Sequence, residues 1–195
     1  MPETSVTSAV DDHTARLIRH GQLQVNDWHV FEPEAAGAKD DETSSVAGAP
    51  PVLPADEPGW IVPLTLWRVA QDALRQRQHP VAVLLASDAK LQDLVGTDGR
   101  VDATGLAFIA IDFPIYTDGR GYSLAQLLRT RHHWQGELRA LGDVMIDTIH
   151  YQARVGFDSF LVKPGHDPEK ALAAFKTFTV HYQQTYPKPP EQLAA

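Results

Sequence analysis

The sequence predicts an α/β protein in which repeated strand–helix units form a small parallel sheet or part of a β/α barrel. Three observations support this. Apolar runs of strand length alternate with segments of helix length from residue 81 onward. Gly136 and Gly156 lie in the short connections between a predicted helix and the next strand. The run at residues 81–86, VAVLLA, shows no polar alternation, as in strands buried on both faces. An open sheet and a barrel arc both satisfy these constraints.

The N-terminal region, residues 1–58, is expected to be acidic and largely flexible. It has eleven acidic and three basic side chains, whereas the rest of the chain is balanced. Residues 33–58 are rich in Ala, Gly, Pro, Ser and acids, a composition that cannot offset the entropy of ordering. Residues 28–31 could form a short strand. The α/β domain is expected to span residues 59–186, followed by a disordered tail at 187–195.

Local patterns define the elements of the α/β domain. The first helix is expected to begin near Pro63, to place Trp67, Ala70 and Leu74 at helical spacing, and to end before Pro80. A polar connection at residues 87–105 has room for a short helix at 91–95. The later elements are predicted in this order: strand 106–111, helix 123–134, strand 137–141, helix 143–155, strand 157–162 and helix 167–184.

Three helix starts carry capping signals. Ser123 followed by Gln126 matches a capping box. Asp143 is a predicted N-cap. Asp167 precedes Pro168, which suits the first position of a helix.

Composition excludes several classes of function. The chain has no cysteine, which excludes disulfides, thiol nucleophiles and Cys-ligated iron–sulfur clusters. No apolar stretch approaches the ~20 residues of a membrane span, and the N-terminus has no apolar signal core. We therefore expect a cytoplasmic protein without a membrane partner. The acidic arm disfavours nonspecific nucleic-acid binding.

The strongest candidate site follows the strand at residues 106–111. In parallel α/β folds, ligands bind beyond the carboxyl ends of the strands. The loops that follow three neighbouring strands, at residues 112–121, 142–143 and 163–166, should therefore lie side by side and form one rim. In the first loop Gly119 and Gly121 permit close backbone approach, and a predicted helix N-terminus follows. Arg120 offers a guanidinium for an oxyanion. An ordinary turn, with Arg120 paired to Asp118 or Asp112, explains the pattern equally well.

The other rim residues extend this site. Asp112 and Asp143 are candidate catalytic carboxylates, either as an acid/base pair or as ligands of a divalent metal. The alternative interpretation of Asp143 is a helix cap without a catalytic role. Residues 120–139 contain four Arg and one acid, which favours an anionic ligand. The predicted anion-binding residues are Thr117, Asp118, Gly119, Arg120, Gly121, Ser123, Arg139 and Lys163. No zinc-site spacing or nucleophile motif is present, and the sequence indicates no particular cofactor.

The segments DFPIYTDGRGYSLAQLLR and GELRALGDVMIDTIHYQARVGFDSF resemble a bacterial family of unknown function. Its genes usually lie beside those of assimilatory sulfite reductase, and its members are often labelled probable oxidoreductases. The resemblance spans roughly residues 60–182. Relatives often have Cys where this chain has Val155, so no thiol mechanism carries over. The family pattern falls on Asp112, Phe113, Pro114, Thr117, Asp118, Gly119, Arg120, Ser123, Gly136, Glu137, Leu138, Arg139, Gly142, Asp143, Val144, Asp147, Gly156, Phe157 and Asp158.

The resemblance implies an accessory role in sulfate or sulfite reduction, with an oxyanion or the sulfite reductase as the binding partner. Two alternatives come from the residues. One is a stand-alone enzyme that acts on a small anion through Asp112 and Asp143. The other is a flavin-dependent oxidoreductase.

Overall fold

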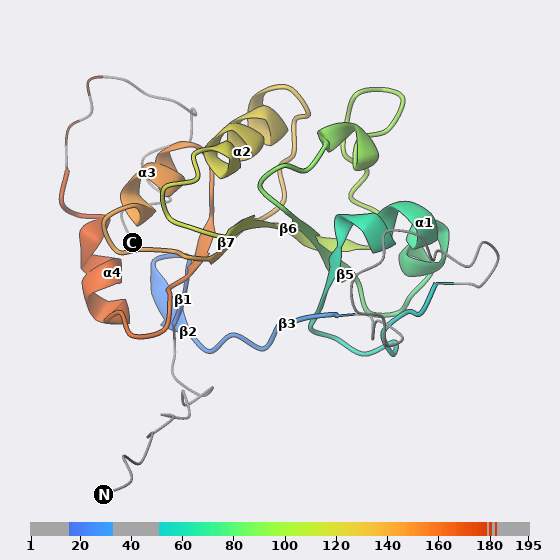
Figure 1. Ribbon diagram of the computed structural model, residues 1–195, viewed down its shortest axis with the longest axis horizontal. Helices are drawn as coiled ribbons and strands as arrows, with labels where there is room; N and C mark the ends of the chain where they lie inside the picture. The colour runs from blue at the N-terminus through green and yellow to red at the C-terminus, as the bar shows by residue number, and fades with distance from the viewer. Residues whose placement is uncertain (1–15, 33–50, 179, 181, 183–195) are drawn as a thin grey trace, which may run out of the picture.

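The computed structural model describes residues 16–32, 51–178, 180 and 182. Within this part of the chain, eight strands form one curled half-barrel sheet and four α-helices pack on it (Figure 1). The predicted α/β class is therefore confirmed. Predictions for residues 1–15, 33–50 and 187–195 lie outside the described residues. No helix within the described ranges is long and apolar enough to cross a membrane.

The strands are β1 (Leu17–Arg19), β2 (Gln22–Gln24), β3 (His29–Val30), β4 (Trp60–Pro63), β5 (Val81–Leu85), β6 (Leu106–Phe113), β7 (Leu138–Gly142) and β8 (Ser159–Leu161). The helices are α1 (Leu64–Arg75), α2 (Arg120–Thr130), α3 (Ile149–Arg154) and α4 (Pro168–Ala174), with a 3-10 turn η1 (Leu91–Asp93).

The sheet has the order β2-β1-β8-β7-β6-β5-β4-β3. Neighbours from β3 to β8 pair in parallel, whereas β1 pairs antiparallel with both β8 and β2. Strands β4 to β8 lie side by side in chain order, as in a β/α barrel, and the order does not reverse as in a doubly wound sheet. Of the two layouts that the sequence left open, the barrel arc is the one observed.

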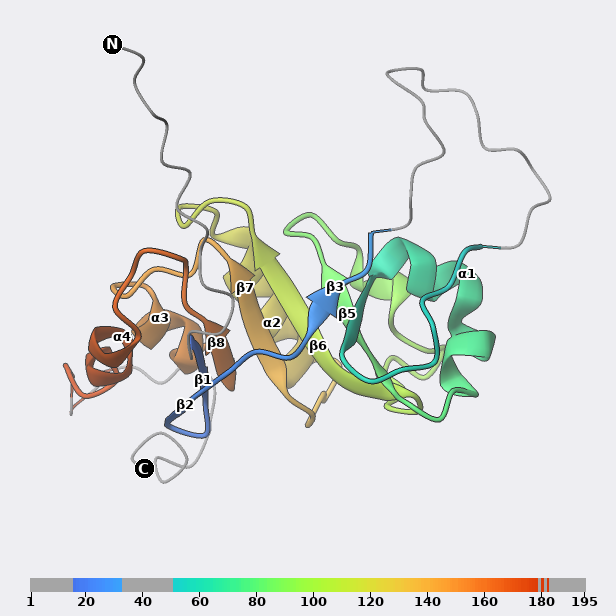
Figure 2. The same ribbon diagram turned by 90° about the horizontal axis from the view of Figure 1, so that it is seen from below.

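The two faces of the sheet are covered differently. Helices α1, α2 and α3 lie together on one face (Figure 1). Residues 25–28 cross the other face on their way from β2 at one edge to β3 at the other (Figure 2). We call this crossing segment the strap. Trp28 of the strap packs edge-on against Phe108, with ring centroids 4.7 Å apart.

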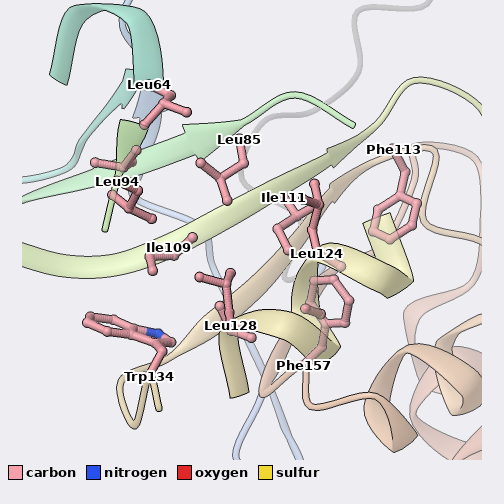
Figure 3. Close-up of a cluster of buried hydrophobic side chains, with 14 of the residues drawn as sticks. Leu64, Leu85, Leu94, Ile109, Ile111, Phe113, Leu124, Leu128, Trp134 and Phe157 are labelled. Atoms are coloured by element: carbon pink, nitrogen blue, oxygen red, sulfur yellow. The ribbon is translucent and has the colours of Figure 1, made fainter. Parts of the chain in front are cut away.

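Both faces of the central strand β6 are buried. Ile109, Ile111 and Phe113 face the helices, where Figure 3 shows them beside Leu124 and Leu128 of α2. Phe108 and Ala110 face the strap. Because side chains alternate along a strand, Asp112 lies on the strap face. This double burial explains why the apolar runs show no polar alternation.

The predicted helix starts are partly wrong. Helix α2 begins at Arg120, and its N-cap Gly119 offers no side chain, so Ser123 lies inside the helix and caps nothing. Helix α3 begins at Ile149, six residues after Asp143. Asp143 is no cap because its carboxylate binds the Tyr116 N–H and Lys163 instead.

The last helix has the predicted start and an earlier end. Asp167 accepts hydrogen bonds from the backbone N–H groups of Glu169 and Lys170, which confirms it as the N-cap of α4. The helix ends at Ala174, ten residues before the predicted end.

The end of the low-complexity segment is also more ordered than its composition predicts. Arg77 donates to the carbonyl oxygens of Pro54 and Ala55, and Asp56 accepts from the N–H groups of Gln78 and His79. These contacts anchor residues 54–56 to the chain just after α1.

Candidate functional site

The carboxyl ends of β6, β7 and β8 form one edge of the sheet. Phe113 of β6 is in register with Gly142 of β7, and Ala140 of β7 with Phe160 of β8. Since these strands are parallel, the loops after them leave the sheet on the same side. The predicted common rim of three loops is therefore present.

Asp143 ties the three loops of the rim together. Its N–H donates to the carbonyl oxygen of Phe113 at 2.7 Å, and its Oδ2 accepts from the N–H of Tyr116 at 2.9 Å. Its Oδ1 lies 2.6 Å from Nζ of Lys163. Lys163, and then the Tyr116 N–H, hold the pKa of the Asp143 carboxyl below its usual range. Asp143 is thus anionic at neutral pH and acts as a structural link.

A second ion pair lies at the start of α2. Asp118 accepts from Nε of Arg120 at 3.0 Å and from Nη2 at 2.7 Å, and also from the Arg120 backbone N–H at 3.1 Å. These bonds from Arg120, with a further one from the Ser87 side chain, hold the pKa of the Asp118 carboxyl well below its usual range. The pairing of Arg120 with Asp118, which the sequence left open, is what the structure shows.

Both ion pairs present the cation to solvent and keep the acid beneath it. The side chain of Arg120 is 60% exposed and that of Asp118 is 9% exposed. For Lys163 and Asp143 the exposed fractions are 45% and 14%. Asp88, also exposed, lies close enough to Arg120 to raise its pKa further. Asp88 is thus the exception, and the two ion pairs themselves expose mainly their cations to solvent.

Two apolar side chains stand on the same rim. Ile115 is 56% exposed and Tyr116 is 47% exposed, in the loop between β6 and α2. The backbone N–H of Tyr116 is held by Asp143, so this loop is fixed where it carries the apolar pair. This apolar pair was not predicted, although two large apolar residues within the polar turn PIYTDG indicate an exposed apolar surface.

Asp112 has an environment unlike that of Asp143. It is half-buried on the strap face at the end of β6, and burial raises the pKa of its carboxyl. Within the described residues its carboxylate makes no hydrogen bond or ion pair. A Cβ at Gly142 would lie 2.5 Å from Asp112 Oδ1 and 2.4 Å from the Phe113 carbonyl oxygen. Gly142, at φ +85°, therefore leaves the space that Asp112 occupies.

The remaining loop residues have mixed roles. Thr117 and Ser123 are exposed. Gly119 has open space around the position of a Cβ, so the backbone there does not require glycine. Gly121 packs directly on the ring of Phe113, where a Cβ would approach to 2.7 Å. Gly121 thus serves helix packing.

Arg139 lies away from the rim, on the strap face of β7. Its guanidinium is buried and donates to Glu137 Oε1 at 2.7 Å, to Ser159 Oγ at 3.2 Å and to Asn26 Oδ1 at 3.3 Å. It also stacks over the ring of Phe108 at 3.8 Å. These contacts fasten the strap to the sheet, and we leave Arg139 out of the site.

The described residues contain no cluster of three or more side chains that could hold a metal ion. His150 packs against the rings of Tyr151 and Phe178.

Comparisons with known proteins place the chain in a family. A search of curated proteins and a search of solved structures each found no match. A family model described as a bacterial protein of unknown function, DUF934, matches residues 82–192, which is more than half of the chain and contains the whole rim. The protein therefore belongs to the bacterial family of unknown function DUF934.

Proposed function

We propose that this protein is an accessory protein of assimilatory sulfate or sulfite reduction that binds an oxyanion, or the sulfite reductase itself, through the rim. The observation that carries the binding site is the orientation of the two ion pairs, with Arg120 and Lys163 outward and their acids beneath. The assignment to sulfate or sulfite reduction rests on the family resemblance of the segments that form the rim.

The two cations of the rim have N–H donors that remain available for an oxyanion. Asp118 engages Nε and Nη2 of Arg120, whereas Nη1 has no partner among the described residues. The Lys163 ammonium has three N–H donors, and Asp143 is its one ion-pair partner in the described chain. Because each cation is already paired, we expect weak binding of a free ion, with a Kd of about 1 mM. Exposed Ile115 and Tyr116 widen the surface for a protein partner.

Growth of a deletion strain tests the pathway. Loss of the gene should slow growth on sulfate or sulfite and leave growth on cysteine unchanged. Wild-type protein and a Lys170→Gln variant, changed at an exposed lysine of α4, should restore growth. A double variant, Arg120→Gln with Lys163→Gln, should restore it poorly. Equal growth of the deletion strain on all three sulfur sources would refute the proposal.

A thermal-shift titration tests the site itself. Sulfite, sulfate and phosphate should raise the melting temperature of the wild-type and Lys170→Gln proteins more than that of the double variant. Identical shifts in all three proteins would show that the anions act elsewhere. Retention of the purified sulfite reductase on immobilised wild-type protein, and its loss with the double variant, would support the protein partner.

A stand-alone enzyme is the second candidate, and Asp112 favours it. An unpartnered carboxylate with a raised pKa, at the carboxyl end of a strand in a barrel arc, suits a general acid or base. The Asp112→Asn variant should then abolish any turnover of a small anionic substrate while leaving its binding at the rim intact. Unchanged turnover would exclude this role. The flavin-dependent alternative stays a prediction, which the visible absorbance of the purified protein tests.

A further inference from the structure

We propose that a groove between the β5–β6 connection and α2 binds a small amphipathic anion, a molecule with one phosphate, carboxylate or sulfonate group attached to an apolar body. The groove has a volume of about 500 Å³. It is lined by residues 89–92, 95–97 and 99 of the connection and by residues 124, 127, 131 and 132 of α2 and its end. This volume falls in the usual range for small-molecule sites. The inference is independent of the rim and of the proposed function.

The floor of the groove is apolar. Leu91 of η1 and Leu124 of α2 are buried parts of the main core, and Val95 is partly buried against the same core. Leu127 of α2 forms a wall and is 40% exposed. Exposed apolar side chains that gather in a concave surface mark sites where a ligand covers them. An apolar ligand body would provide that cover.

The lining of the groove carries basic groups and no acid. Lys90, Arg131 and His132 all contribute to it. Neither Lys90 nor Arg131 has an ion pair within the described part of the chain. Three acids lie close by in the chain without lining the groove. Asp88 lies near Arg120, Asp93 pairs with Arg68 at 3.8 Å, and Asp98 accepts from the backbone N–H of Arg100 at 3.0 Å. The charge of the lining therefore complements an anion.

His132 holds the groove in shape. Its Nδ1 lies 2.8 Å from the carbonyl oxygen of Gly99. A carbonyl oxygen can only accept a hydrogen bond, so Nδ1 carries a proton and is the donor. The other ring nitrogen, Nε2, remains available to a ligand. This bond joins the end of α2 to the loop that closes the other side of the groove, and a site formed before binding loses less entropy when it binds.

Calorimetric titration of the full chain with 1-naphthyl phosphate tests the proposal, with inorganic phosphate and 1-naphthol as separate probes. We expect 1-naphthyl phosphate to bind more tightly than either fragment. Arg131→Gln should weaken its binding about fivefold to tenfold, the loss of one charge-assisted hydrogen bond. Leu127→Ser should weaken it about threefold or more through lost apolar contact. Lys170→Gln is the matched control, because Lys170 is an exposed cation on α4 that lies outside both the groove and the rim.

Each other outcome overturns the proposal. No binding of 1-naphthyl phosphate would refute it outright. If inorganic phosphate binds equally well and Arg131→Gln weakens that binding, the apolar floor contributes nothing. If 1-naphthol binds equally well, the cations contribute nothing. An equal loss in Lys170→Gln and Arg131→Gln would place the ligand away from the groove. Failure of the rim titrations would not affect this result.

Discussion

Replacement of Arg129 by methionine should strongly destabilise the fold, although the sequence shows Arg129 as one of four similar arginines around α2. Its side chain is only 2% exposed. Nε and Nη2 donate to the carbonyl oxygen of Gly156 at 3.0 and 2.8 Å. Nη1 donates to the carbonyls of Trp134 and Gly136 at 2.7 and 2.8 Å, and Nη2 also pairs with Asp158. Arg129 thereby joins the end of α2 to the turns before β7 and β8.

The magnitude follows from what the substitution leaves behind. Arg129→Met keeps most of the apolar stem but leaves three buried carbonyl groups without these donors. Asp158 keeps a hydrogen bond from the Leu138 N–H at 2.8 Å and loses its ion pair with Arg129. Removing one partner of a buried charge pair costs about 3–5 kcal/mol, and we expect Arg129→Met to fall in this range. A loss of this size is a large share of the ~5–15 kcal/mol that stabilises a typical domain.

Urea unfolding followed by circular dichroism measures this loss. The control is Arg131→Met, two residues later and exposed, which should change the free energy of unfolding by less than about 0.5 kcal/mol. If Arg129→Met does not fold, Arg129→Lys should still fold, with a smaller loss of about 1–3 kcal/mol, since it keeps the charge but not the fork of donors. A free energy of unfolding for Arg129→Met within about 1 kcal/mol of wild type would refute the structural role.

Three further changes test the rim. Gly142→Ala should cost about 1–3 kcal/mol in a urea melt, because a Cβ would lie 2.4 Å from the Phe113 carbonyl oxygen at a positive φ; an unchanged midpoint would contradict this. Burial raises the pKa of Asp112, so its ionised form opposes folding. Asp112→Asn should therefore stabilise the protein at neutral pH, and the gain should vanish in melts below about pH 3.9, the unfolded value. The pKa of Asp143 is lowered, chiefly by Lys163, so this pair stabilises the fold above about pH 3.9, and the stabilisation is lost as the pH falls through the lower folded value. Lys163→Gln should cost under about 1 kcal/mol at pH 7 and nothing in strong acid; an equal cost at both would exclude an electrostatic origin.

Local sequence patterns were sufficient to predict those elements that form because of residues close together in the chain. The apolar run of β5 and the cap of α4 at Asp167 were placed correctly from residues close together in the chain. By contrast β1 and β2 were missed, since each has only three residues and exists through pairing: β1 with β8 and β2 with β1. The start of α3 was misplaced because the carboxylate of Asp143 bonds to Tyr116, 27 residues away in sequence.

The sequence by itself determined the α/β class, the rim of three loops and the acidic character of the N-terminal region, because hydrophobic periodicity and charge are properties of neighbouring residues. The tertiary structure alone decided the barrel arc and the role of each charged side chain. Arg120, Arg129, Arg131 and Arg139 are alike in the sequence, yet the structure buries two and exposes two. Which of them can meet a ligand depends on carbonyl and carboxylate groups that distant segments bring into reach, and this information is absent from local sequence.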